Sequence, residues 1–393
     1  MATTALQAPG RWASALAAVL SLGLVFAAWQ LGGADSDSQA LSLSLLGGAL
    51  FGLLLQRSRF CFFCVTRDFI EQRKPDGLLG ILAALAVGTL GYHLVFGAFV
   101  PDPSSGRLPP DAHVGPLSWV LGLSATVFGI GMALSGSCIS AHLYRLGEGA
   151  FASLFVLFGA LMGFFLGFLC WNPLYLLSTQ QAPVVWLPAW QGYGVSFLLQ
   201  IALLGGLACW LLLHVQASTE PRVVARNLRQ LLFGQRWPTW VGGVLIGFLA
   251  TLSYLRVGPL GVTAELGSVA RTAADGLGWL PERLEGLDSF SGCATAVKEA
   301  LLSNNGLFIL GLVVASWASA LLAGDFQPKR PRVSELLRNL LGGILLGWGS
   351  MLALGCTVGT LLSGIMAGAL SGWVFAVFCL VGVWLGLRIR RYW

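Results

Sequence analysis

Residues Gly129–Cys138 read GIGMALSGSC, and residues Gly347–Cys356 read GWGSMLALGC. Each stretch opens with two glycines that stand two positions apart, and each ends in a cysteine at the tenth position. A second match lies upstream of each, because Gly47–Gly52 (GGALFG) resembles Gly242–Gly247 (GGVLIG). Matches in the same order along a chain indicate an internal repeat. The chain is therefore predicted to consist of two related halves.

The composition of the chain is that of a membrane protein. Of its 393 residues, 56% are hydrophobic and 10% are charged, and the mean hydropathy is +0.78. Soluble domains carry about 25% charged residues, so a chain this poor in charge cannot cover a globular surface with solvated groups. A soluble enzyme, a nucleic-acid reader and a disordered protein are thereby excluded. The net charge of +6 is spread over loops, so we expect a lipid bilayer and no nucleic acid as partner.

Hydropathy divides the chain into ten apolar segments. They lie at residues 13–32, 41–56, 77–99, 117–134, 149–170, 194–214, 239–255, 306–324, 336–353 and 368–387. A helix needs about 20 residues to cross a bilayer. The sequence therefore predicts an all-α polytopic membrane protein with about ten spans.

Basic residues gather in alternate connections. They lie at residues 57–74, 220–236 and 325–338 and at the C-terminal residues 388–391. Ten crossings bring these clusters to one side of the membrane, together with Arg11. The positive-inside rule assigns that side to the cytoplasm. Both termini are therefore expected in the cytoplasm.

The repeat and the number of spans together set the relation between the halves. We assign the first repeat to residues 1–193 and the second to residues 194–393, with five apolar segments in each. Because five is odd, the second half is expected to be inverted relative to the first. Inverted repeats are typical of transporters, whose substrate site lies near the midplane where broken helices meet.

Four cysteine-containing segments interrupt the apolar pattern. They are residues 56–68 with Cys61 and Cys64, residues 135–142 with Cys138, residues 289–295 with Cys293, and residues 354–359 with Cys356. Non-helical backbone at membrane depth survives where it lines a cavity or is packed in protein, so we expect broken or re-entrant helices here. The candidate pathway residues are Cys61, Cys138, Cys293, Cys356, Gly136, Gly292 and Gly355.

The long connection from Val257 to Asn304 is expected on the outer side. Its residues 258–263 stand where residues 57–61 stand in the first half. We expect part of this connection to dip inward and form the outer mouth of a pathway, with Cys293 near its entrance.

Several of these features have simpler interpretations. A cysteine in a membrane helix is usually a small packing residue, which fits Cys170, Cys209 and Cys379 because no glycine break surrounds them. Cys293 could be an ordinary residue of an extracellular loop. The spacing of Cys61 and Cys64 is also that of a redox motif or half a zinc site, but the chain has no second CxxC and no histidines at ligand spacing. Residues 67–68 are expected to form an ion pair or a helix cap.

A family resemblance follows from these motifs. The string QRSRFCF at residues 56–62 with Arg67 and Asp68, the two glycine–cysteine breaks and the inverted halves resemble the YeeE/YedE family of sulfur-transport membrane proteins. The resemblance implies uptake of thiosulfate across the bacterial inner membrane. It also implies three pathway cysteines, at the positions of Cys61, Cys138 and Cys356, and a small cytosolic sulfur-carrier protein of the TusA-like type as partner. Cys64 and the outer connection with Cys293 depart from the family pattern.

The chemistry of thiols suits such a pathway. Moving a bare ion into hydrocarbon costs on the order of tens of kcal/mol, so a path must supply a donor at each step without trapping the ion. A protonated thiol is a weak donor, and helix N-termini add positive dipoles. We therefore expect a permease that imports thiosulfate by relay along protonated thiols and helix ends, with no metal or cofactor. The alternatives are a permease for sulfite or a selenium compound, and a membrane thiol enzyme that handles persulfide with Cys61 or Cys138 as nucleophile.

Overall fold

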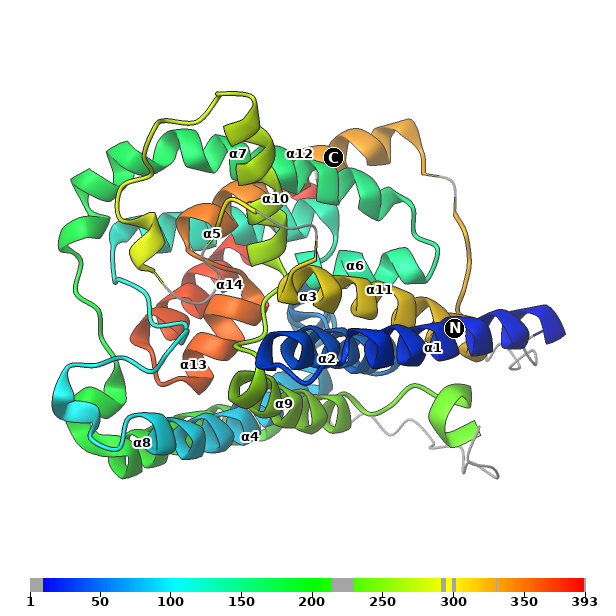
Figure 1. The fold of residues 1–393 in the computed structure, drawn as a ribbon, viewed down its shortest axis with the longest axis horizontal. Coiled ribbons are helices and arrows are strands. Elements are labelled where there is room, and N and C mark those ends of the chain that lie inside the picture. The colour runs from blue at the N-terminus through cyan, green and yellow to red at the C-terminus, as the bar shows by residue number, and fades with distance from the viewer. Residues whose placement is uncertain (1–9, 214–229, 291–294, 299–301, 330, 392–393) are drawn as a thin grey trace.

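The protein is described by a computed structural model that covers residues 10–213, 230–290, 295–298, 302–329 and 331–391, and these residues form helices and loops without a strand (Figure 1). The first eight helices are α1 (Arg11–Leu31), α2 (Ser36–Ser58), α3 (Phe62–Gln72), α4 (Asp76–Phe99), α5 (Trp119–Ser135), α6 (Ile139–Gly147), α7 (Ala152–Leu177) and α8 (Leu187–Leu213). The others are α9 (Thr239–Arg256), α10 (Thr263–Gly276), α11 (Asn304–Ala323), α12 (Val333–Leu352), the π-helical segment η5 (Thr357–Ser363), α13 (Gly364–Met366) and α14 (Leu370–Arg390).

The predicted number of spans is confirmed. Within the described ranges, nine helical stretches are long and apolar enough to cross a membrane. Two of these are interrupted helices: α2 continues into α3, and α5 continues into α6. A tenth candidate is α12 with the segment 357–366, which bends by 43° at the break between them. The chain is thus an all-α polytopic membrane protein, and three spans in the described ranges are broken at a predicted cysteine-containing segment.

Hydroxyl and carboxylate side chains start several of the spanning helices. Asp35 accepts a hydrogen bond from the backbone N–H of Ser38 at the start of α2, at 2.9 Å. Ser118 and Ser303 do the same for the first turns of α5 and α11. These caps satisfy N–H groups that have no acceptor within the helix. Such local signals fix where the spans begin, whereas packing fixes how they are arranged.

The two parts of the chain are interlocked (Figure 1). Helix α2 packs along α11, α4 along α9, α5 along α14 and α7 along α12, while α5 also contacts α12. Each pair joins a helix from before residue 193 with one from after it. Helices α1 and α8 lie at the periphery, where α1 packs on α11 and α8 packs on α4. Neither part of the chain therefore has a closed core of its own.

Glycines set the close approach within these pairs. A Cβ atom at Gly48 on α2 would lie 1.9 Å from the carbonyl oxygen of Phe308 on α11. A Cβ atom at Gly243 on α9 would lie 2.0 Å from the carbonyl oxygen of Gly80 on α4. Small residues of this kind let the backbones of membrane helices touch. Gly48 and Gly243 are also partners in the sequence repeat.

The molecule has two distinct ends. At one end, the end of α2 meets the ends of α6 and α11 and the residues before α9. Arg390 of α14 also lies within electrostatic range of Arg338 of α12, Arg67 of α3 and Arg145 of α6 there, and we call it the arginine-rich end. At the opposite end, the starts of α2 and α11 meet the end of α9 around a pocket. The three broken spans run between these two ends.

Candidate functional site

Each of the three described candidate cysteines stands directly before a helix. Cys61 precedes α3, Cys138 precedes α6 and Cys356 precedes η5. All three are at most 2% exposed. Two of the predicted glycines form the breaks, since Gly136 has a φ of +85° and Gly355 a φ of +153°, values that an L-residue rarely adopts. Three of the four predicted breaks are therefore present, and the fourth, at residues 289–295, lies largely outside the described residues.

The structure brings two of these cysteines into contact. The Sγ atoms of Cys61 and Cys138 are 3.9 Å apart, and the Sγ atom of Cys138 is 3.3 Å from the hydroxyl of Ser140. Cys64, one turn into α3, also contacts Cys61 and accepts a hydrogen bond from Nη2 of Arg145 at 3.4 Å. No group of three or more His, Cys, Asp or Glu side chains in the described part of the chain is arranged to hold a metal ion. These side chains therefore form a row of thiols between the starts of α3 and α6.

A small cavity lies between this row of thiols and the break before η5, which contains Cys356. It has a volume of about 10 Å³ and is bordered by Cys138 on one side and by Thr357 and Val358 on the other. Its remaining lining residues are Phe51, Leu55, Phe60, Phe62, Ile81, Ser140 and Leu362. A space of this size holds roughly one water molecule. Cys356, at the start of η5, contacts the side chain of Thr263 at the start of α10.

A larger pocket of about 440 Å³ lies at the opposite end. It is lined by α2, α9 and α11 and by residues 258–261, the connection that was predicted to dip inward. Ser44 and Arg256 also line it, and the Ser44 hydroxyl is buried without a hydrogen-bond partner among the described residues. The carbonyl oxygen of Leu260 accepts a hydrogen bond from Ser363 of η5 at 3.5 Å. The wall of the pocket therefore contacts η5, the segment that follows the break at Cys356.

The other cysteines differ from this set. Cys379 is buried on α14, while Cys170 and Cys209 are exposed on helix surfaces. None of these three is in a break, as the sequence indicated. Cys293 and Gly292 lie outside the described residues, so their predicted roles stay predictions.

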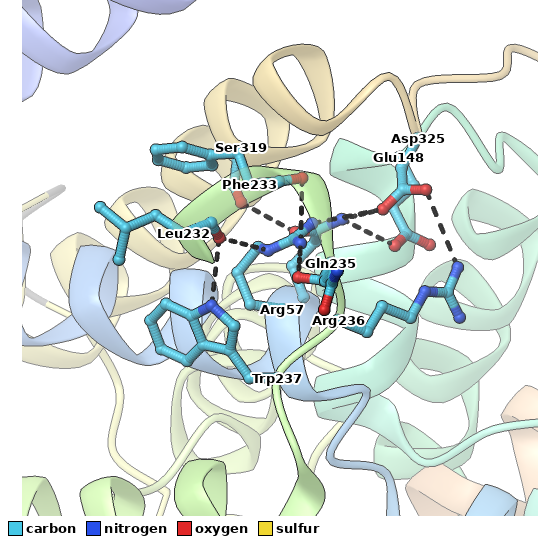
Figure 2. Close-up of polar contacts among 10 residues, drawn as sticks. Arg57, Glu148, Leu232, Phe233, Gln235, Arg236, Trp237, Ser319 and Asp325 are labelled. Atoms are coloured by element: carbon cyan, nitrogen blue, oxygen red, sulfur yellow. Dashed lines mark hydrogen bonds and ion pairs between the residues drawn. The ribbon is translucent and has the colours of Figure 1, made fainter. Parts of the chain in front are cut away.

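A buried polar cluster that the sequence did not reveal lies at the arginine-rich end (Figure 2). Arg57 was counted among the loop charges, but it is only 1% exposed. Its guanidinium donates to the carbonyl oxygens of Leu232 and Phe233, each at 3.1 Å, and to that of Gln235. It also lies 3.6 Å from a carboxylate oxygen of Asp325. Arg57 thus ties the end of α2 to the residues before α9 and to the end of α11.

Gln56 extends the cluster to the turn after α6. Its Nε2 donates to Glu148 at 3.3 Å and to Asp325 at 3.1 Å, and its Oε1 accepts from Ser319 at 2.8 Å. Arg236 lies 3.8 Å from Asp325 (Figure 2). Burial raises the pKa of the Glu148 carboxyl above its usual range. The cluster fixes the backbone two residues before the break that contains Cys61.

Comparison with known proteins identifies the family. The model of a family described as "Sulphur transport" matches residues 57–385, from the buried Arg57 to the last turns of α14. The chain belongs to this family. Among curated relatives of this sulphur transport protein is the thiosulfate transporter TsuA of Escherichia coli (strain K12), 25% identical over 363 residues, which are 86% of this chain and 92% of the relative.

Two further relatives show how the similarity is distributed. The thiosulfate transporter TsuA of Spirochaeta thermophila is 28% identical over 360 residues, which cover 86% of this sulphur transport protein and 96% of the relative. The probable transporter YedE of Escherichia coli (strain K12) is 34% identical over 85 residues, 21% of each chain. The region matched by the family includes Cys61, Cys138 and Cys356. The resemblance stated from the sequence motifs is therefore confirmed.

Proposed function

We propose that this sulphur transport protein is a permease that imports thiosulfate across a bacterial inner membrane. In this proposal the arginine-rich end and both termini face the cytoplasm, as the positive-inside rule requires. The pocket at the opposite end is then the outer mouth. The observation that carries the proposal is the contact between the thiols of Cys61 and Cys138 at the starts of two helices.

The order of the features supports a continuous route. The outer pocket adjoins η5 through Leu260, and Cys356 lies at the start of η5. The small cavity then reaches from η5 to Cys138, which contacts Cys61. A cavity of about 10 Å³ is too small for a tetrahedral oxyanion. Passage therefore requires the break at Cys138 and the break at Cys356 to move apart. Alternating access in transporters works by such relative movement around a central site.

The chemistry of the route favours transfer over trapping. Thiol S–H groups are weak donors, so they can replace water around the ion one contact at a time. The N–H groups at the starts of α3 and α6 add positive partial charge beside Cys61 and Cys138. A small cytosolic sulfur-carrier protein of the TusA-like type is our proposed receiver, because net uptake continues while the imported sulfur is consumed.

The inverted repeat is part of the same proposal, with residues 1–193 and 194–393 as its halves. Reciprocal packing supports it. Gly48 of α2 packs on α11 while its repeat partner Gly243 of α9 packs on α4. Gly129 of α5 packs on α14 while its partner Gly347 of α12 packs on α7. An exchange of partners of this kind is expected if a two-fold axis in the membrane plane relates the halves.

Uptake of radiolabelled thiosulfate tests the proposal. The protein is expressed in bacterial cells that lack their own thiosulfate importers, and the initial rate of uptake is measured with unlabelled sulfate, sulfite or selenite as competitor. We expect uptake that depends on expression and that thiosulfate itself suppresses most strongly. Stronger suppression of uptake by sulfite or selenite than by thiosulfate would indicate that the stronger competitor is the substrate. The absence of thiosulfate uptake by correctly inserted protein would refute the thiosulfate permease.

A membrane thiol enzyme is the second candidate. It is favoured by the contact between Cys61 and Cys64, whose spacing is that of dithiol oxidoreductases. In that case the Cys61 thiolate would attack the outer sulfur of thiosulfate, the S–S bond of thiosulfate would break, sulfite would leave with the bonding electrons, and Cys61 would hold the outer sulfur as a persulfide. The two candidates differ in whether sulfur stays on the protein, which intact-mass measurement detects.

A further inference from the structure

Arg145 stands just beyond the row of thiols, in the last turn of α6. Its Nη1 donates to the carbonyl oxygen of Gly136 at 3.3 Å, and its Nη2 donates to the Sγ atom of Cys64 at 3.4 Å. No carboxylate oxygen among the described residues lies within 4.0 Å of its guanidinium. Arg145 is therefore a partly buried cation that makes no direct ion pair in the described part of the chain, although the Glu148 carboxylate lies within electrostatic range of it.

Helix capping explains only part of this arrangement. Gly136 ends α5, so the contact with its carbonyl oxygen places positive charge at a helix C-terminus, which is favourable. A guanidinium has five N–H donors. Besides the contact with Gly136, Arg145 donates to Cys64 and contacts the side chain of Tyr144, so part of its donor capacity is left for a ligand. The Glu148 carboxylate interacts with Arg145 electrostatically, but it accepts its hydrogen bond from Gln56 and makes no ion pair with the Arg145 guanidinium within 4.0 Å. Burying a cation without a carboxylate is costly, and an anion that visits the site would offset that cost.

The surroundings of Arg145 favour an anion as that visitor. Arg390 interacts electrostatically with Arg338, Arg67 and Arg145. Asp68 neutralises Arg67 at 2.6 Å, which confirms the predicted ion pair. Glu71 is the only acidic group that acts on Arg390 among these neighbours in the described chain. Arg145 therefore lies in a region where several guanidinium groups are close to one another, and Glu148 is an acidic group within electrostatic range of it.

We propose that Arg145 and Cys64 together bind the transported sulfur oxyanion at the inner end of the thiol row, before its release. This inference rests on the proposed function and adds a site to it. The guanidinium accepts the oxygens of the sulfonate group through paired N–H donors, which Arg does better than Lys. The thiol of Cys64 faces the terminal sulfur. A site with one hard and one soft contact prefers an oxyanion that carries a terminal sulfur or selenium over sulfate.

The first test compares two replacements of Arg145. Arg145→Gln keeps a neutral donor for Gly136 but removes the charge, whereas Arg145→Lys keeps the charge. We expect initial uptake to fall at least tenfold in Arg145→Gln and no more than about threefold in Arg145→Lys, at equal abundance in the membrane. Arg388→Gln is the matched control, because Arg388 lies at the same end but stacks on the Trp384 ring, and it should keep full uptake.

The second test measures binding without transport. Purified wild-type protein in detergent is alkylated with a maleimide, and the modification of Cys64 is followed by peptide mass spectrometry. Thiosulfate should slow this modification several-fold and sulfate should not. Arg145→Gln should lose the protection, and Arg145→Lys should keep most of it.

The outcomes separate this inference from the proposed function. Full uptake and undiminished protection of Cys64 in Arg145→Gln would overturn the Arg145–Cys64 site while leaving the permease intact. Equal losses of uptake in the Gln and Lys variants, with protection unchanged, would assign Arg145 to helix capping and would also overturn the site. Slower modification of Cys64 in the wild type when thiosulfate is present, with the faster rate restored when thiosulfate is removed, would support the Arg145–Cys64 site. If the wild type takes up no thiosulfate but Cys64 is still protected, the permease fails and the anion site remains.

Discussion

The Sγ atom of Cys61 lies 3.9 Å from the Sγ atom of Cys138, although 77 positions separate the two residues. The contact exists because α3 and α6, the helices that follow the breaks after α2 and α5, begin side by side. The first N–H groups of a helix have no acceptor within it. Two such sets of donors therefore converge beside two buried thiols.

Removal of the thiols in the paired breaks is expected to stop transport without unfolding the protein. Cys138→Ala and Cys356→Ala should each reduce thiosulfate uptake to below about a tenth of wild type. Each deletes one buried atom, and most single substitutions cost about 1 kcal/mol. Uptake is measured in cells, and folding by size-exclusion chromatography of the purified protein.

The matched control for these variants is Cys379→Ala. Cys379 is equally buried but lies inside the continuous helix α14. It should retain uptake. Wild-type uptake rates in both Cys138→Ala and Cys356→Ala would refute the relay. An equal loss of uptake in Cys379→Ala would show that all three losses come from disturbed packing.

Intact-mass spectrometry separates the permease from the thiol enzyme. Purified protein incubated with thiosulfate should keep its mass and release no sulfite, because a relay forms no covalent bond to sulfur. The control is the same protein after treatment with an inorganic polysulfide, which adds sulfur to accessible thiols. A gain of one sulfur atom on Cys61 or Cys138 from thiosulfate, formed as fast as sulfite appears, would favour the enzyme.

The orientation of the chain can be tested with two exposed positions. Glu282 lies in the connection after α10, and Lys74 follows α3. Glu282→Cys should react with an impermeant maleimide added to intact spheroplasts, and Lys74→Cys should react only after lysis. The unsubstituted protein reports the background from Cys170 and Cys209, which are exposed. Labelling of Lys74→Cys in intact spheroplasts would contradict the assigned orientation and the inverted repeat that depends on it.

The buried cluster predicts different roles for two arginines that approach the same carboxylate. The side chain of Arg57 is 2% exposed and that of Arg236 is 46% exposed, and both lie within 4 Å of Asp325. Breaking a buried pair typically costs about 3–5 kcal/mol, whereas a surface pair contributes about 0–1 kcal/mol. Arg57→Ala should therefore lower abundance and the melting temperature strongly, and Arg236→Ala only slightly. Similar melting temperatures for the two variants would show that Arg57 does not support this end.

Acid should weaken the fold through His113, which lies in the loop between α4 and α5. His113 is 5% exposed, and burial lowers its pKa from about 6.5 to about 4. Between these values the unfolded chain binds a proton that the folded protein does not. The free energy of unfolding should therefore fall as pH decreases from about 6.5 to 4, by up to about 3 kcal/mol from this group.

Thermal unfolding in detergent at pH 7.5, 6, 5 and 4.5 measures the effect. His113→Gln should show a smaller decrease in melting temperature toward acid pH than the wild type. Parallel curves for the two proteins would exclude His113 as a source of acid sensitivity.

The spans and breaks could be predicted from the sequence because their causes are local. A run of apolar residues specifies a span, and a glycine with a positive φ, such as Gly136, ends a helix wherever it is placed. The three cysteines were located for the same reason, since each follows a break. That Cys61 should face Cys138 rather than Cys356 could not be predicted, because contact depends on helix packing between distant segments.

Charged residues mislead sequence reasoning at this end of the molecule. In the sequence, Arg57 and Arg145 cannot be distinguished from exposed loop arginines, because the positive-inside rule accounts for basic residues at both positions. Their contacts join segments far apart in the sequence, since Arg57 donates to residues before α9 and Arg145 to Cys64 of α3, and no local pattern encodes such contacts. A polar residue directly at the end of an apolar run, as in Gln56, was the one available hint.

The interlocked packing of α2 with α11 and of α4 with α9 constrains how the protein is made. When the ribosome has delivered the first five spans, the glycine faces of α2 and α4 have no partner, because their partners lie in the chain still to be synthesised. We therefore expect biogenesis to pass through an inserted but unassembled half that membrane proteases can reach until synthesis is complete. Co-expression of residues 1–193 and 194–393 as separate chains should protect each from degradation, whereas either half expressed alone should be short-lived in a pulse-chase experiment.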